Sequence, residues 1–569
     1  LKILLWSIAS ILLLLCILIF ALQFKPVQTF VAKKAATYLS QELNTTVSLT
    51  GLYIKPFKSV VLEGLLVLDK QNDTLLNTPK FLVDLNQFSL KKRIVDVSSI
   101  QINDGAFFLK SYKNGSTNLD FIIDYFKSGA EPTVKKKKKP FDLTFNRIII
   151  NNLRFKYKNQ KIDTVIKGVN FDDIDLTGFN GIFEGLNTAE HLLQTNIKNL
   201  TFKEKSGFFL KNLSALTTVD SNQIELKKLL LITNQSRLTD YYQMNFETFD
   251  DFNDYFNKVR MKANFKNSHL AAKDIAYFTP ALEGMNLNID LDGQVSGLVN
   301  NLRAKQLSVK AGKATYIKGD FNVKGLPNLK ETFMDLKIDM AGSNKKDLDE
   351  LLTSTTGKKA KGIPEIVSKF GNFNFNGTFT GFQNDFIAYG EFKTKLGRVV
   401  SDVNMKIDKA GVPSYSGYVK TYDFNIGQLL NEKSLGRVTS AVNIKGRGTE
   451  IKSLRENIDG EIKYIDFNNY RYQNVSINGV FAKKQFDGNL KINDKNVQLV
   501  FSGGVNLNPD LPVFNFHATI RNAKLKALKL TQDSMKIDAD FNTNFSGDNL
   551  NNIQGDLYVG NIRMNNAKG

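Results

Sequence analysis

Most of the chain alternates polar and apolar residues, which is the pattern of β-strands with one apolar face. Residues 372–380 read NFNFNGTFT and residues 535–545 read MKIDADFNTNF. Because residues i, i+2 and i+4 project to the same side of a strand, each run gathers its apolar side chains on one face. Similar runs occupy residues 336–340, 441–445, 461–467 and 489–493. Turn-forming residues separate the runs, so the sequence predicts a large, mostly antiparallel sheet.

The first segment has a different pattern. Residues Ile3–Leu22 are apolar and uncharged. At about 1.5 Å per residue they cover roughly 30 Å, the thickness of the hydrocarbon core of a bilayer. A cleaved signal peptide has a shorter core of about 7–15 residues. A lipoprotein signal needs a small residue before the modified cysteine, whereas Cys16 lies within a Leu run. We therefore expect an uncleaved transmembrane signal anchor and, since the chain starts at Leu1, further residues upstream.

Few helices are expected elsewhere. Residues 27–43 place Val27, Val31, Ala35, Tyr38 and Leu39 on one face of an amphipathic helix. We expect this helix to cover the first open end of the sheet. Shorter helices are predicted at residues 119–126, 248–258, 271–278 and 345–352.

Two weak internal repeats are present. Asn457–Ile462 (NIDGEI) recurs as Asn552–Leu557 (NIQGDL), and we interpret each as a turn followed by a strand. Ile100–Phe108 (IQINDGAFF) and Ile148–Phe155 (IIINNLRF) share a strand, polar-turn, strand pattern. Such repetition is typical of a sheet lengthened by adding strand pairs.

The chain contains few residues that carry catalytic chemistry. Its single cysteine lies in the predicted anchor, and His191, His269 and His517 are far apart in sequence. No phosphate-binding loop or nucleophile elbow occurs, and we interpret Gly503-Gly504 as a bulge or turn. We therefore expect no enzyme activity, no catalytic residues, no metal and no cofactor.

The formal net charge is +20, from 76 Lys and Arg against 56 Asp and Glu. These charges are interspersed on the polar faces and do not form an aromatic-lined basic stripe, so no nucleic-acid partner is expected. Attraction to anionic headgroups or acidic partner surfaces fits better. The basic run Lys135–Lys139 lies between two prolines and is predicted to be an exposed loop. Asp172, Asp173 and Asp175 lack the spacing of a calcium loop.

Exposing an apolar sheet face to water costs about 25 cal/mol of free energy per Å², so the face must be covered. A second sheet or a layer of helices can cover it, the sheet can close as a membrane barrel, or it can curl around lipid chains. Few helices are predicted, and an uncleaved anchor argues against an outer-membrane barrel. Alternation alone leaves the other solutions open.

The chain resembles the AsmA-like/TamB family of envelope proteins. The resemblance rests on the anchor, the helix at 27–43, the later N-I-x-G units, and the stretches Thr46–Ile54, Leu62–Asp69, Phe81–Leu85, Ile94–Ile102 and Gly115–Phe121. It implies a U-shaped, repeating antiparallel β-groove that bridges the periplasm of a diderm bacterium. The protein would be a single-pass inner-membrane protein that carries phospholipid toward the outer membrane. The C-terminal region typical of TamB is not evident, so we expect the sequence to be truncated there.

The expected organisation follows from this resemblance. It comprises an anchor (1–25), an N-terminal AsmA-like helix and strands (26–130), a basic linker (131–140), a β-groove segment with short helices (141–360) and a repeating β-groove segment (361–569).

The candidate lipid-contacting residues are the apolar members of the alternating runs: Phe373, Phe375, Phe379, Val442, Ile444, Ile462, Tyr464, Ile537 and Phe541. Ordinary core packing is the alternative role for each. The alternative function is an assembly factor for outer-membrane proteins that works with a barrel partner.

Overall fold

The computed structural model describes residues 24–55, 59–89, 94–128, 142–162, 167–189, 192–279, 282–356, 363–448, 455–508, 510–549 and 552–566. The predicted anchor, Ile3–Leu22, and the basic run Lys135–Lys139 lie outside these residues. Within the described residues, no helix is both long enough and apolar enough to cross a membrane.

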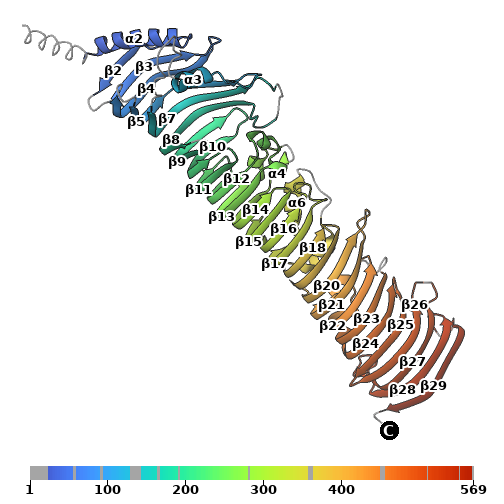
Figure 1. Ribbon diagram of the computed structural model, residues 1–569. Helices are drawn as coiled ribbons and strands as arrows, with labels where there is room; N and C mark the ends of the chain where they lie inside the picture. Colours follow the sequence, from blue (N-terminus) through green and yellow to red (C-terminus); the bar gives the residue numbers. More distant parts are fainter. Residues whose placement is uncertain are drawn as a thin grey trace, which may run out of the picture. The chain divides into compact units, whose positions relative to one another are not determined.

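The protein is mainly β, as predicted, and forms two compact units, residues 1–292 and 293–569. The boundary falls within β14 (Asn288–Leu298). In Figure 1 the strands within each unit bend along their length.

The strands of the first unit are β1 (Val47–Ser48), β2 (Gly51–Lys55), β3 (Ser59–Leu68), β4 (Thr74–Ser89), β5 (Ile94–Asn103), β6 (Ala106–Ser111), β7 (Asp142–Asn159), β8 (Asp173–Ala189), β9 (Leu192–Glu204), β10 (Phe209–Val219), β11 (Gln223–Ile232), β12 (Arg237–Asn245) and β13 (Arg260–Ala271). Its helices are α2 (Lys25–Glu42), α3 (Asp120–Ser128), η1 (Phe249–Asp254), α4 (Tyr255–Lys258) and α5 (Ala272–Ile275).

The strands of the second unit are β15 (Asn301–Ala311), β16 (Thr315–Lys324), β17 (Phe333–Ser343), β18 (Phe373–Phe382), β19 (Asp385–Thr394), β20 (Gly397–Ile407), β21 (Pro413–Asn425), β22 (Leu435–Arg447), β23 (Arg455–Phe467), β24 (Tyr470–Ala482), β25 (Gln485–Asp494), β26 (Val497–Asn506), β27 (Val513–Lys524), β28 (Met535–Ser546) and β29 (Gln554–Asn566). Its helices are α6 (Lys345–Thr356), η3 (Glu365–Phe370) and α7 (Ile426–Leu430).

The strand pairings are antiparallel with one exception, and most join strands that follow one another in sequence; β1 pairs with β3, however, and β6 with β4. β7 pairs in parallel with β5 along its first half and with β6 along its second half. The prediction of a mostly antiparallel sheet is therefore correct, but it missed this parallel pair. A parallel pair needs a long crossover, and residues 112–141, which include α3, provide it here.

Bulges interrupt the regular alternation at similar points in many strands. A residue with positive φ lies at or beside seven of the register shifts: Asn152, Asn199, Lys228, Asn267, Gln306, Asp423 and Asn522. The residue that follows each of them is buried: Leu153, Leu200, Leu229, Ser268, Leu307, Phe424 and Ala523. Asn adopts this left-handed conformation more readily than most residues, and a bulge bends its strand and increases its twist. The bulges therefore curve each unit around its most buried positions.

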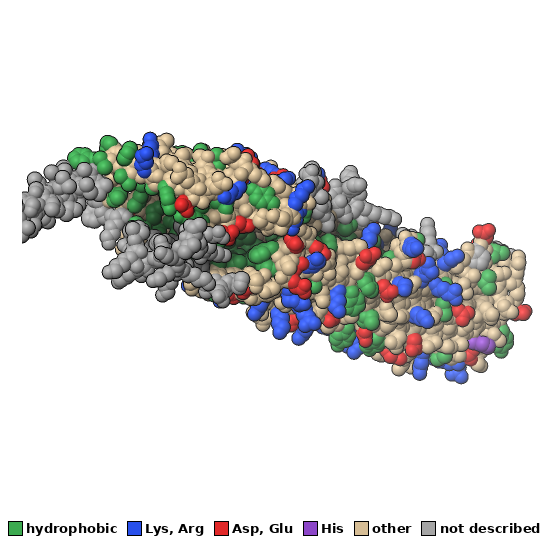
Figure 2. Space-filling model, turned by 45° about the horizontal axis from the view of Figure 1, so that its top comes forward, with side chains coloured by type: hydrophobic (Ala, Val, Ile, Leu, Met, Phe, Trp, Pro, Cys, Tyr) green, Lys and Arg blue, Asp and Glu red, His purple; other side chains and the backbone are tan. Residues whose placement is uncertain are grey.

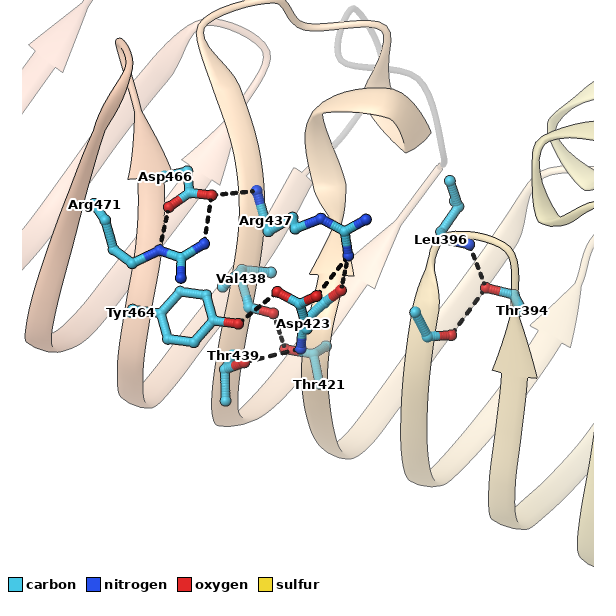
Figure 3. A network of polar contacts seen from close by, with 11 residues as sticks. Thr394, Leu396, Thr421, Asp423, Arg437, Val438, Thr439, Tyr464, Asp466 and Arg471 are labelled. Carbon is cyan, nitrogen blue, oxygen red and sulfur yellow. Dashed lines mark hydrogen bonds and ion pairs between the residues drawn. The ribbon is translucent and has the colours of Figure 1, made fainter.

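Side chains on the next strand satisfy the backbone N–H groups that these bulges free. Asn522 N donates to Asp538 Oδ1 at 2.6 Å, and Asp423 N donates to Thr439 Oγ1 at 2.9 Å (Figure 3). The same arrangement recurs for Asn152 with Asn180, Asn199 with Ser214, Asn267 with Asp292, and Gln306 with Asp320. The bulges are thus specified by two residues each, one in the left-handed conformation and one acceptor.

Glycines allow close approach between strands in the second unit. Gly460 has φ +149°, and a Cβ there would lie 2.4 Å from the carbonyl oxygen of Ala441. Gly555 has the same relation to Asn544 O, at 2.3 Å. Asn457–Gly460 lies inside β23, so the turn predicted for this N-I-x-G unit is wrong; in the second N-I-x-G unit Asn552 and Ile553 precede β29, but Gly555 lies inside it. Gly503-Gly504 likewise lies within β26, whose register is regular on both sides, and not in a bulge or turn. Glycine is common in turns, but within a strand it can permit a sharp bend without breaking the alternation. The presence of glycine alone therefore suggested a turn where the chain continues as a strand.

Helix α2 forms where it was predicted, but it packs through a different face. Pro26 starts it. Its buried residues are Gln28, Ala32 and Ala36, whereas Val31 and Tyr38 of the predicted apolar face are 51% and 57% exposed. The small alanines let the helix approach β1 and β2 closely, and Ile54 N donates to Gln28 Oε1 at 2.8 Å. Close backbone approach therefore determines the packed face, and the larger apolar side chains point outward.

Candidate functional site: the apolar sheet face of the second unit

The second unit carries rows of apolar side chains that run from strand to strand on one face of its sheet. Directly paired residues of antiparallel strands share a face. Phe375 pairs with Ala341 on β17 and with Phe392 on β19. The ring of Phe379 stacks on that of Phe386 with centroids 4.7 Å apart. The predicted grouping of Phe373, Phe375 and Phe379 on one face fits this register.

Val442 and Ile462 belong to the most buried part of the face. They are 5% and 7% exposed and lie in a cluster with Leu396, Phe424, Val438 and Val475. Ile444, opposite Ile458, packs against this cluster and remains partly exposed. Val442 and Ile462 therefore act as core residues, and Ile444 extends the face.

The last strands continue the same face. Phe541 pairs with Ala518 on β27 and with Val559 on β29. Ile537 pairs with Ala523 and Met564. One row that contains Phe541 crosses six strands: Ile477, Leu490, Phe501, Ala518, Phe541 and Val559.

Tyr464 is in a polar network instead of the apolar cluster. A register shift between Thr439 and Ser440 breaks the alternation that would place Tyr464 beside Ile462. Its hydroxyl donates to Asp423 Oδ1 at 2.6 Å, and the Arg471 guanidinium lies 4.1 Å from the centre of its ring (Figure 3). Ile465, the next residue, packs against the apolar cluster. Beyond the bulge, the apolar face is thus continued by Ile465.

The apolar face is only partly covered by protein. In β18 the inward residues Phe373, Phe375 and Phe379 are partly exposed, and Asn374, Asn376 and Thr378 on the other face are exposed. Among the described residues, all the prominent contacts between strands join strands that pair in the sheet; no second sheet stacks on this face. Phe370 of η3 and Ile426 and Leu429 of α7 pack on the face near Val442 and Ile462, whereas along β18 its apolar side chains stay partly exposed.

One edge of this face carries a row of large side chains, of which the alternating runs included only Phe545. On the apolar face, a residue close to the hairpin turn is aromatic or apolar in eight of the strands: Phe386, Met405, Tyr415, Phe481, Phe486, Val505, Phe514 and Phe545. The Phe514 and Phe545 ring centres are 4.9 Å apart. Each residue falls next to a turn at the end of its strand, so it was less visible in sequence than the central alternation.

The opposite face is polar and carries several ion pairs. Arg521 binds Asp540 at 2.7 Å, and Asn561 Nδ2 donates to the same carboxylate. The Arg521 and Asn561 hydrogen bonds hold the pKa of Asp540 at about 2, so this carboxylate stays ionised. Within the described residues, no group of three or more His, Cys, Asp or Glu could hold a metal ion.

The first unit has an apolar face of its own. Ile197, Leu200, Phe208 and Leu210 form a buried cluster, with Phe179, Phe183 and Phe202 packed around it. Figure 2 shows hydrophobic side chains within a hollow at the left of the view, where the first unit lies, and charged side chains spread over the outer surface.

No protein-family model matches the chain, and no curated protein or solved structure matches it. The interpretation of its function therefore depends on the chemistry of these two faces.

Proposed function

We propose that this protein carries phospholipid along the apolar face of its curled β-sheet, as a member of the AsmA-like/TamB type of envelope protein. In this proposal the apolar segment Ile3–Leu22 anchors it in the inner membrane, and the rest lies in the periplasm and leads toward the outer membrane. The observation that carries the proposal is the partly exposed apolar face of the second unit, on which no second sheet stacks among the described residues.

The driving force would be the cost of exposing acyl chains to water. At about 0.8 kcal/mol per CH2, a 16-carbon chain in water costs roughly 12 kcal/mol. Phe375, Phe379, Ile444 and Phe541 offer an apolar surface on which a chain can move from strand to strand. The headgroup would stay in water at the edge of this face, so transfer would need no fully solvated lipid.

The outward face of helix α2 favours contact with a membrane at the N-terminal end of the protein. Its outward face carries Phe30 and Val31, 63% and 51% exposed, together with Lys33 and Lys34. Large apolar side chains beside lysines are typical of helices that lie at a lipid interface. This face follows the apolar segment by only a few residues, as expected for a helix that rests on the bilayer.

Site-specific photocrosslinking tests the proposal. A photoreactive residue at Phe375, Ile444 or Phe541 should capture phospholipid from cells, detected by mass spectrometry of the purified protein. The matched positions Asn376, Asn443 and Asn542 lie one residue away on the polar face and should capture little. Equal, background labelling at both sets would refute the proposed lipid path.

The alternative function, an assembly factor for outer-membrane proteins, predicts a different result. Lipid adducts would be absent from both faces, and an outer-membrane barrel would copurify with the full chain. The same cells provide both measurements.

A further inference from the structure

One carboxylic acid interrupts the apolar row at the turn edge of the second unit. Four successive strands place Tyr415, Gly446, Glu456 and Phe481 side by side on the apolar face. In β23, the exposed residues 455, 457, 459 and 461 alternate with the partly buried residues 456, 458, 460 and 462. Glu456 thus shares its face with Ile458 and Ile462, both part of the apolar cluster region.

Aromatic rings flank this carboxylate. The ring of Tyr415 lies over Gly446, where a Cβ would come within 2.8 Å of it, so it leans across β22 toward Glu456. Its hydroxyl donates to the Gly448 carbonyl at 3.2 Å. On the other side, the paired residue Phe481 is 41% exposed and leaves its ring open to solvent. Gly446 is the only residue of this row without a side chain, and the gap it leaves is filled by the tyrosine.

Among the residues that the structure describes, no cationic side chain neutralises Glu456. No hydrogen bond or ion pair joins its carboxylate to any residue that the structure describes, although cationic side chains are abundant on the opposite face. Burial alone raises the pKa of this carboxyl, and its charge in turn adds to the raised pKa of Tyr415. An unpaired carboxyl on an apolar face costs stability unless a ligand supplies the missing charge.

We infer that Glu456, with the rings of Tyr415 and Phe481, binds the ammonium group of a lipid headgroup at the edge of the apolar face. A carboxylate beside aromatic faces is the chemistry that recognises ammonium ions, through charge and cation–π attraction. The acyl chains would lie on the adjoining apolar rows, beside Ile458 and Ile444. This inference rests on the proposed function and adds to it a preference for lipids with a cationic nitrogen over purely anionic ones.

Lipid competition tests the inference. The full chain, purified in detergent, is incubated with equal amounts of phosphatidylethanolamine, phosphatidylcholine and phosphatidylglycerol, and the bound lipids are quantified by mass spectrometry. The wild-type protein should enrich the ammonium-bearing lipids over phosphatidylglycerol, and Glu456→Gln should lower that ratio about three- to tenfold, the range expected for loss of one such contact. The two ammonium lipids distinguish a primary amine from a choline site.

Two variants serve as controls. Glu461→Gln, on the same strand but on the polar face where Ser476 donates to it at 2.8 Å, should leave the ratio unchanged. Glu456→Asp keeps the charge and should retain part of the enrichment. Bound lipid with the same ratio in wild type and Glu456→Gln would overturn the ammonium site alone, whereas absence of lipid from every variant would overturn the proposed function as well.

Discussion

Asn152 donates a hydrogen bond from Nδ2 to Oδ1 of Asp104 at 2.8 Å, across the parallel pair in the first unit. Both residues have positive φ, +53° and +51°. They occupy equivalent places in the two similar stretches Ile100–Phe108 and Ile148–Phe155, which pair in register along their length. Asn151 and Asn103 form a second such bond at 2.8 Å. The internal repeat is therefore two copies of one bulged strand, laid side by side.

The left-handed residues at the bulges should be replaceable by glycine but not by β-branched residues. Asn199 has φ +51°. Asn199→Val should lower the free energy of unfolding by about 1–2 kcal/mol, the cost of the left-handed conformation, and Asn199→Gly should be close to neutral. Urea denaturation of the full chain measures both. Asn376→Val, on the regular strand β18, is the control and should cost little; equal losses for Asn199→Val and Asn376→Val would contradict the role of the bulge.

Alternation was sufficient to predict the class of fold, the six strands that the alternating runs cover and the apolar face. Residues 372–380 form one strand with its phenylalanines on one side because no bulge interrupts them. The helices at 119–126 and 345–352 were also predicted correctly, as α3 and α6. These elements depend on local periodicity, which a sequence displays directly.

Features that depend on departures from alternation were missed. Tyr464 was assigned to the apolar face because a period of two was extended through a bulge. Bulges such as the one at Asn199 carry a recognisable sequence pattern. An apolar residue is followed by any residue, then by Asn or a similar residue, and then by a second apolar residue, as in Ile197-Lys198-Asn199-Leu200. The outward face of α2 could not be predicted, because its packing depends on how closely the alanines let β1 and β2 approach.

Gly460 should not tolerate a side chain. A Cβ at this position would lie 2.4 Å from Ala441 O, an atom of the backbone that cannot move aside easily. We expect Gly460→Ala to destabilise the protein by more than about 2 kcal/mol, from strain and lost strand pairing. Gly411→Ala is the matched control, because Gly411 also has positive φ (+82°) but no atom lies within 4 Å of its would-be Cβ. Equal melting temperatures for Gly460→Ala and Gly411→Ala would contradict the argument from close approach.

Asp347 should make stability depend on pH at the acid end. This α6 residue accepts hydrogen bonds from the backbone N–H groups of Lys313, Ala314 and Thr315 and from the Thr315 hydroxyl. Burial raises the pKa of Asp347, but these donors outweigh it and lower the pKa to about 2. The pKa of Asp347 in the folded protein is below the usual 3.8 of an aspartate, so the stabilisation is present above about pH 4 and is lost as pH falls toward 2.

Replacement of this carboxylate tests the pH dependence. Asp347→Asn should be less stable than wild type at pH 7, and the difference in urea midpoint should shrink as the pH falls from 4 to 2. Asp402→Asn, at an exposed position, should show no such convergence. If the difference in urea midpoint between wild type and Asp347→Asn stayed constant across this range, the carboxylate charge would not be what stabilises the turn between β15 and β16.

The outward face of α2 should lie within a bilayer interface. The chain has one tryptophan, Trp6, so Trp6→Phe gives a background in which a new indole reports alone. In vesicles that contain brominated acyl chains, the fluorescence of a Phe30→Trp variant should be quenched strongly, because Phe30 is exposed on that face. An Asn376→Trp variant, on the polar face of β18, should be quenched little. Equal quenching of both variants would contradict a specific α2 contact.

A cation placed on the apolar face should stop lipid movement without unfolding the protein. Phe375, Ile444 and Phe541 are suitable because each is partly exposed, whereas Val442 and Ile462 are buried and an arginine there would destabilise the core. Phe375→Arg, Ile444→Arg and Phe541→Arg should each reduce lipid transfer between donor and acceptor vesicles at least tenfold. Circular dichroism and thermal melts should remain close to wild type.

The matched controls lie one residue away on the polar face, at Asn376→Arg, Asn443→Arg and Asn542→Arg. They add the same charge to the same strands, so they separate an obstruction of the apolar face from a general effect of charge or of altered vesicle binding. Transfer should continue in these three variants, because an arginine on that face points into water. If the inward and outward arginines slowed transfer equally, or if neither set did, acyl chains would not travel along this face.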